Sequence, residues 1–285
     1  MPIPVEIKIP RRWRILSSTY RRVLPASFDE VEESRRLPLW RALLSHAGDA
    51  GKMAAIRYLL KLPKGVFRRL SDDQAFALLE AMPWLEAMPH PSPRITQFEY
   101  KGQEYFLPKT HGVNLVAIEY AIADEAFCKW AETGQEKSIL MLCGTLCREA
   151  HQDESAAITR GDRRAPLLSK SEAQARADHF ADLPEDIRTA VILYFAGVKE
   201  FIANSYGKVL FEQPEGEEKQ GSTAPSLGWW SVYFSLAIDG PFGRDVKLVY
   251  QVPFHDLCLF LVDRIRQQKA DALRQKVASK SFGQE

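Results

Sequence analysis

The sequence has few of the features that indicate a metal site, a disulfide scaffold or a membrane span. Only 4 of the 285 residues are cysteine, and no C-x-x-C pair occurs, so neither a disulfide framework nor a redox motif is indicated. No run of about 18 apolar residues exists that would span a bilayer as a helix. The 38 Lys and Arg residues nearly balance the 37 Asp and Glu residues, for a net charge of +1. This balance gives no general attraction for a polyanion, so nucleic-acid binding is not predicted.

Recognisable catalytic motifs are also missing. The six histidines stand in separate segments without an H-x-x-x-H or H-E-x-x-H spacing. Gly240-Pro-Phe-Gly243 lacks the further glycines and the lysine of a phosphate-binding loop, and is interpreted as a turn. Asp72 and Asp73 are typical first-turn acids that complement a helix dipole. We therefore expect no cofactor, no metal and no enzymatic activity.

One row of soft metal ligands is present. Cys143, Cys147 and His151 are spaced i, i+4 and i+8, which places them on one face of a continuous helix. Such a row spans about 12 Å, too far for all three to reach one tetrahedral zinc ion. We interpret the cysteines as core residues, and a metalloenzyme is kept as a third hypothesis.

Apolar residues recur every three or four positions through most of the chain, which predicts a mainly α protein with a multi-helix, bundle-like architecture. Helices are predicted over residues 50–61, 72–82, 115–134, 135–150, 170–181, 185–204 and 256–277. A further helix follows the capping-box pattern of Ser27 and Glu30 and is interrupted near Pro38. The polar residues 151–169 are expected to form a loop. Residues 228–238 fit helix or strand, and the spacing of their aromatic residues favours a helix.

A small β-hairpin is predicted over about residues 95–107. Two short runs rich in aromatic and β-branched residues are separated only by Lys101-Gly102, where glycine permits the positive φ of a tight turn. Prolines flank both sides. Since an isolated hairpin is only marginally stable, we expect it to lie against helices.

Changes of composition divide the chain into four parts. Residues 1–24 are predicted to form a basic, extended N-terminal arm, and residues 25–211 a helical domain that carries the hairpin. Residues 212–226 are rich in Pro, Gly and Glu and are predicted to be an acidic flexible loop. Residues 227–285 are predicted to be helical, to pack on the main domain and to end in a basic tail.

Aromatic and basic residues supply the candidate partner-binding surface. Aromatic side chains are enriched at protein interfaces, although core packing is their commoner use. The basic C-terminal helix is suited to an acidic partner, although its cations also complement the helix dipole. The candidate residues are Phe98, Tyr100, Tyr105, Phe106, Trp229, Trp230, Tyr233, Arg264, Arg266 and Lys269.

The start of the chain and its free cysteines predict a cytoplasmic protein. Met1-Pro-Ile-Pro-Val-Glu lacks the basic and apolar pattern of a secretory signal. The low cysteine content suits a reducing compartment.

The order of several motifs resembles a family of phage proteins. These motifs are the hairpin Phe98–Pro108, Leu183-Pro-Glu-Asp-Ile leading into Tyr194-Phe-Ala-Gly197, and Gly228-Trp-Trp ahead of Leu236–Gly243. In this order they are similar to proteins of tailed phages and prophages that are encoded beside the tail tape-measure protein. The resemblance covers about residues 25–265 and implies no cofactor and no catalytic residue.

The resemblance implies a non-catalytic tail assembly chaperone that shields amphipathic helices of the tape-measure protein during tail morphogenesis. Such a protein would use a helix-in-groove mode of recognition. The alternative is a structural tail or connector protein that remains in the mature particle. The oligomeric state stays open.

Overall fold

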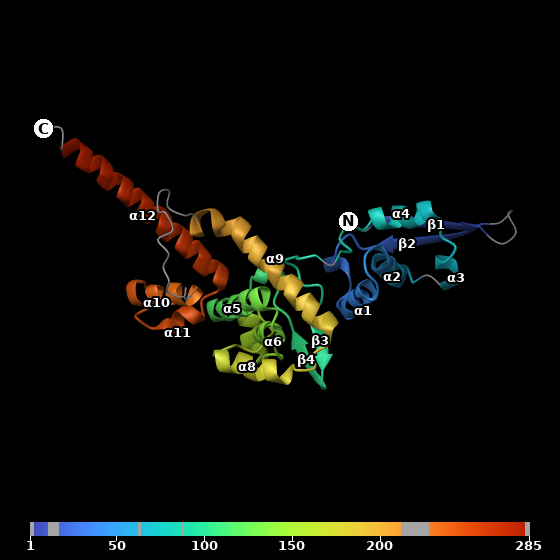
Figure 1. Cartoon of the computed structure of the whole chain (residues 1–285), viewed down its shortest axis with the longest axis horizontal. Helices are drawn as coiled ribbons and strands as arrows, with labels where there is room; N and C mark the ends of the chain where they lie inside the picture. Colours follow the sequence, from blue (N-terminus) through green and yellow to red (C-terminus); the bar gives the residue numbers. More distant parts are fainter. Residues whose placement is uncertain (1–2, 11–16, 62–63, 87, 212–227, 283–285) are drawn as a thin grey trace.

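The computed structural model describes residues 3–10, 17–61, 64–86, 88–211 and 228–282. It is mainly α-helical, with two small antiparallel hairpins, which confirms the predicted fold class. The long helix α9 (Glu185–Leu210) runs through the centre of the molecule (Figure 1). The N-terminal elements lie toward one end of it and the C-terminal helices toward the other. The predicted loop 212–226 lies outside the described residues.

The described residues of the segment predicted to be a basic, extended arm, 3–10 and 17–24, form a β-hairpin. Strands β1 (Ile3–Pro10) and β2 (Ser17–Leu24) pair antiparallel, from Ile3 opposite Leu24 to Pro10 opposite Ser17. Ile7 and Leu24 are buried. The prolines and arginines of this segment obscured an alternation of apolar residues along β1, and burial of one side of the hairpin is what selects the paired strands.

The N-terminal helices follow directly. A 3₁₀ turn (Phe28–Glu30) precedes α1 (Glu33–Leu44), α2 (Asp49–Leu60), α3 (Lys64–Phe67) and α4 (Asp72–Glu80). The capping box at Ser27 is wrong: the Ser27 side chain makes no cap, and Glu30 accepts a hydrogen bond from the Ala26 amide at 2.8 Å. The predicted break at Pro38 is also wrong. Helix α1 continues through this proline, because Leu39, Trp40 and Leu43 are buried directly after it and hold the helix in place.

The middle of the chain contains the predicted hairpin. Strands β3 (Gln97–Tyr100) and β4 (Gln103–Phe106) are joined by Lys101 and Gly102, both with positive φ, as a two-residue hairpin turn requires. A 3₁₀ turn, η2 (Thr110–Gly112), then leads into α5 (Ala117–Thr133), α6 (Glu136–Leu146), α7 (Glu154–Arg160) and α8 (Lys170–His179).

Helix α7 lies within residues 151–169, which the sequence predicted as a loop. Asp153 starts this short helix, since its carboxylate accepts hydrogen bonds from the amides of Ser155 and Ala156. The helix buries none of its residues, so it carries no apolar stripe that a periodicity argument would detect.

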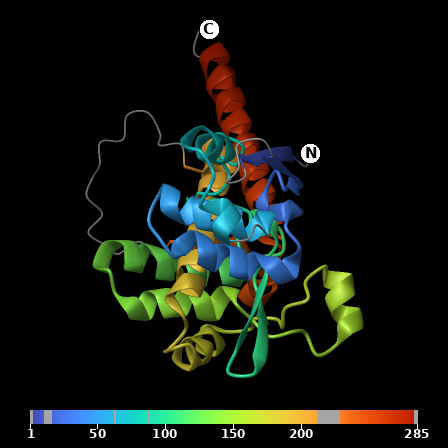
Figure 2. The ribbon, with the colours of Figure 1, turned by 90° about the vertical axis from the view of Figure 1, so that its right-hand side faces the viewer.

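Three helices complete the chain: α10 (Trp229–Asp239), α11 (Val246–Tyr250) and α12 (Phe254–Phe282). The preference for a helix over a strand at residues 228–238 is confirmed. The first part of α12 packs against α9, and its remainder extends beyond the rest of the molecule (Figure 1, Figure 2). Within the described residues, no helix combines the length and the apolar content that crossing a membrane requires.

Close contacts hold the helices around α9. A side chain on Gly197 would lie 2.1 Å from the His90 carbonyl carbon, so only glycine lets α9 approach that loop. A side chain on Gly144 of α6 would likewise lie 2.4 Å from the Ala173 carbonyl oxygen of α8. At the N-terminal end of α9, the buried Trp40 indole donates to the Asp186 carbonyl at 2.7 Å, which ties α1 to α9.

Candidate functional site

Three of the four hairpin aromatics predicted to bind a partner are buried in the structure. Phe98, Tyr105 and Phe106 are buried, with exposed fractions of 3%, 3% and 6%. Phe98 stacks on Tyr105 across the hairpin, and both rings pack on Phe180, the residue that ends α8. Only Tyr100 is partly exposed, and its ring meets Phe180 edge-on. The hairpin therefore covers the end of α8 with its aromatic side chains. The strand sequence alone does not reveal which side of the hairpin is covered.

The aromatic residues after the acidic segment also serve packing. Tyr233 is fully buried and donates to the Ala117 carbonyl at 2.8 Å, so it is not a surface residue. Trp229 and Trp230 are half-buried. Trp229 packs edge-on against Phe254, and the Trp230 indole donates to Glu125 at 3.2 Å. These contacts attach α10 to α5 and to the start of α12.

The predicted cations of α12 remain at the surface. Arg264 is half-buried, whereas Arg266 and Lys269 are exposed. Residues 266–275 are exposed at every position. Helix α12 has 29 residues and is therefore about 43 Å long, so its outer half is a free-standing basic helix (Figure 1).

Further apolar residues near the start of that helix were not among the predicted site residues. Five large apolar side chains in α10, α11 and the start of α12 are between 37% and 67% exposed. We call them the C-terminal apolar surface: Phe234, Ile238, Leu248, Leu259 and Phe260. Helix α10 packs on α11. In the turn between them, the Phe242 ring lies edge-on to the Phe260 ring of α12, with 6.3 Å between the ring centroids. The repeat of Phe234 and Ile238 was visible in the sequence, but periodicity cannot say which side of a helix stays uncovered.

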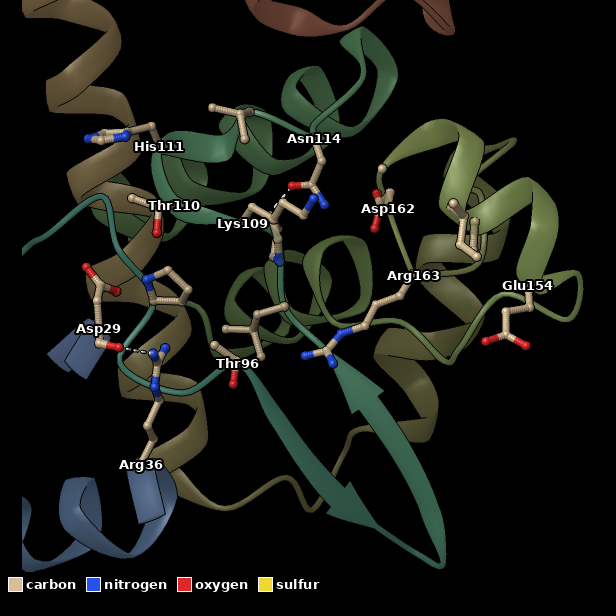
Figure 3. Close-up of a pocket in the computed structure, with 17 residues that line it drawn as sticks. Asp29, Arg36, Thr96, Lys109, Thr110, His111, Asn114, Glu154, Asp162 and Arg163 are labelled. Carbon is tan, nitrogen blue, oxygen red and sulfur yellow. Dashed lines mark hydrogen bonds between the residues drawn. The ribbon is translucent and has the colours of Figure 1, made fainter. Parts of the chain in front are cut away.

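A cleft of about 910 Å³ with both polar and apolar residues in its lining lies between the 3₁₀ turn before α1, the η2 segment and helix α7 (Figure 3). Four of its charged residues, Asp29, Arg36, Asp162 and Arg163, have hydrogen-bond partners. Asp29 accepts from the Ser92 hydroxyl at 2.6 Å, and the Arg163 guanidinium contacts the Glu33 carboxylate at 2.6 Å. The His111 ring is turned away from the cleft and packs on Phe201 at 4.2 Å. Asp29 and Arg163 are thus each engaged with a residue outside the lining.

Beneath this cleft lies a buried ionic network of Glu119, Arg148, Asp162 and Arg164, whose residues are between 1% and 8% exposed. The Arg164 guanidinium donates to Glu119 at 3.1 Å and to Asp162 at 2.8 Å. Arg148 pairs with Glu119 at 2.7 Å. The network joins α5 to the segments on both sides of α7.

The network shifts the pKa values of its members. Burial and the neighbouring Arg164 lower the pKa of Arg148 to about 10. Burial also disfavours the charge of Arg164, but Glu119 and Asp162 outweigh this and raise its pKa. Burial alone would raise the pKa of Asp162, and the Arg164 charge and hydrogen bonds lower it instead. Two buried carboxylates therefore neutralise two buried guanidinium groups, and all four side chains are used within the core.

The cysteine and histidine row is not a metal site in the structure. Cys143 lies in α6, Cys147 is the residue that ends this helix, and His151 lies in the following segment. Both thiols are buried, and burial raises the pKa of Cys143 to about 12. Within the described residues, no group of three or more His, Cys, Asp or Glu side chains is arranged to hold a metal.

No protein-family model, curated protein or solved structure matches this chain.

Proposed function

We propose that this protein is a non-catalytic tail assembly factor that shields amphipathic helices of a tape-measure protein in the cytoplasm of the host cell. The C-terminal apolar surface carries the proposal. Phe234 and Ile238 lie one turn apart on α10 and are 47% and 67% exposed, so they present an apolar stripe to solvent. Soluble proteins rarely leave several large apolar side chains exposed in one region unless a partner covers them.

The neighbouring basic helix suits the same task. An amphipathic helix that docks on Phe234 and Ile238 gains apolar burial, and the cations of α12 then pair with acids on its polar face. Specific complexes cover about 800 Å² on each partner. Binding through side chains that stay partly solvated allows release when tail-tube subunits compete for the same helices.

The chemistry of the remaining sites is consistent with a binding protein. In the cleft beside α7, Asp162 accepts from Arg164 and Arg163 donates to Glu33. The Ser92 hydroxyl donates to Asp29 and is only 2% exposed. This serine has no histidine base at its hydroxyl oxygen, since His90 accepts from the Ser92 amide instead. The motif resemblance described above supplies the link to phage tails.

The test is co-expression with the tape-measure protein encoded in the same genome. We expect soluble tape-measure protein with the unmodified chain, and a clear loss with the double variant Phe234→Ser, Ile238→Ser. The matched control is Phe76→Ser, Ile158→Ser, which removes two apolar side chains of α4 and α7 that are 61% and 75% exposed. An unchanged yield of soluble partner when the chain is omitted contradicts the proposal.

Mass spectrometry of purified particles distinguishes a chaperone from the alternative, a connector or other structural tail protein. A chaperone is expected to be absent or far below stoichiometric amounts. A stoichiometric presence would favour the structural role.

A further inference from the structure

A groove of about 690 Å³ between α1 and α2 is lined by three cations and by no acidic residue. The cations are Arg35 on α1, Arg57 on α2 and Lys61, which ends α2. Within the described residues, none of these three side chains has an ion pair or a hydrogen-bond acceptor. Ala42, Ser45, Ala54 and Tyr58 form the rest of the lining.

The other cations of the same two helices are all engaged, which sets the groove apart. Arg41 pairs with Asp186 at 2.8 Å, and Lys52 pairs with Glu86 at 3.0 Å. Arg36 donates to the carbonyls of Val31 and Asp29. The three groove cations are therefore a local exception.

Arg35 is the most informative of the three. It is the third residue of α1, where the positive end of the helix dipole disfavours a cation. It is half-buried, and its Nη2 atom is buried without a hydrogen-bond partner. Burying a guanidinium nitrogen without an acceptor is costly. Stacking on the Tyr58 ring at 5.4 Å compensates only part of this cost and also holds the guanidinium in place.

Arg57 and Lys61 extend the same site. They are four residues apart in the sequence, and both line the groove at the C-terminal end of α2. Their position near the end of α2 suits the negative end of its dipole. That explanation does not apply to Arg35, and it does not account for the missing acid between the two helices.

We infer that this groove binds an acidic peptide segment of a partner protein, with the guanidinium groups of Arg35 and Arg57 pairing with its carboxylates. Guanidinium forks match carboxylates in a bidentate geometry. The alanines and Tyr58 offer apolar contacts that suit a peptide backbone and aliphatic side chains. A nucleic acid would need a longer series of phosphate contacts than three cations supply. The surrounding sequence adds attraction, because residues 1–82 contain 15 Lys and Arg but only 9 Asp and Glu.

The site lies on α1 and α2, apart from the C-terminal apolar surface, so the two proposals stand or fall separately. The test measures fluorescence anisotropy of a labelled peptide of about twelve residues that alternates Glu or Asp with Leu or Ala. The same peptide with Gln and Asn in place of the acids, and a single-stranded DNA of equal charge, are the comparison ligands. The full-length protein is used throughout.

We expect saturable binding of the acidic peptide that weakens as salt is added, at least tenfold weaker binding to Arg35→Gln, Arg57→Gln, and no binding of the neutral peptide. The control variant, Arg160→Gln, Lys247→Gln, removes two exposed cations from α7 and α11 and should bind like the unmodified protein. Circular dichroism of each variant verifies the fold. Equal losses in both variants, no saturable binding, or tighter groove-dependent binding of the DNA would overturn the inference. The last outcome would indicate a nucleic-acid site.

Discussion

The buried ionic network beneath the cleft leads to a specific prediction about the free energy of unfolding. Glu119 is 1% exposed and contacts the guanidinium groups of both Arg148 and Arg164, at 2.7 and 3.1 Å. The substitution Glu119→Gln keeps the shape of the side chain but removes its charge. Asp162 is then the only carboxylate left in the network to face two buried arginines.

The expected loss of stability follows from that imbalance. Removing one partner of a buried ion pair costs about 3–5 kcal/mol, because the other charge stays buried and uncompensated. Arg148 increases the effect, since its Nε and Nη1 atoms already lack a hydrogen-bond partner. Folded domains are stable by only about 5–15 kcal/mol, so this single substitution removes a large share of the total.

Urea unfolding followed by circular dichroism measures this effect. The control is Glu136→Gln, which removes a carboxylate from an ion pair with Arg188 in which the Glu136 side chain is 64% exposed. That pair lies at the surface, so its loss should cost about 1 kcal/mol or less. If Glu119→Gln costs no more than the control, the network does not hold the fold together and the reasoning is refuted.

Three further predictions rest on single features. The pKa of Asp162 is lowered in the folded state by Arg164, so its contribution to stability is present at neutral pH and is lost as the pH falls through this lowered pKa; acid unfolding should therefore shift to higher pH in Arg164→Met, and an unchanged midpoint would contradict this. Gly197→Ala should destabilise the protein by about 1–3 kcal/mol in thermal unfolding, because its new methyl group would lie 2.1 Å from the His90 carbonyl carbon; a loss below about 1 kcal/mol would show that the loop moves away freely. In the native protein a thiol reagent should label Cys128 first, because the other three thiols are buried; rapid labelling of all four would mean that the core opens.

The periodicity of apolar residues predicted most of the helices and the hairpin correctly. These elements depend on local patterns, such as the apolar stripe of α9 or the Lys101-Gly102 turn, that a short segment carries by itself. The starts of elements were predicted less well. The capping box at Ser27 failed because Glu30 accepts a hydrogen bond from the Ala26 amide, a choice between local partners that sequence spacing does not distinguish.

The residues of the candidate site were also predicted only in part. The sequence identified the aromatic residues of the hairpin, yet the structure buries Phe98 and Tyr105 against Phe180, a residue more than seventy positions away. It also located the basic C-terminal helix, but not the exposed Phe234 and Ile238 beside it. No pattern in the sequence pointed to the groove cations, since Arg35 and Arg57 are ordinary helix residues until α1 and α2 pack together.

The sequence by itself determined the helical class, the small hairpin and the kinds of side chain available for binding, because each depends on residues close together in the chain. Only the tertiary structure decided which aromatic residues are core, which cations lack a partner and which carboxylates neutralise the buried arginines. Burial and ion pairing are set by contacts between distant segments. A residue's role in them becomes defined when those segments pack.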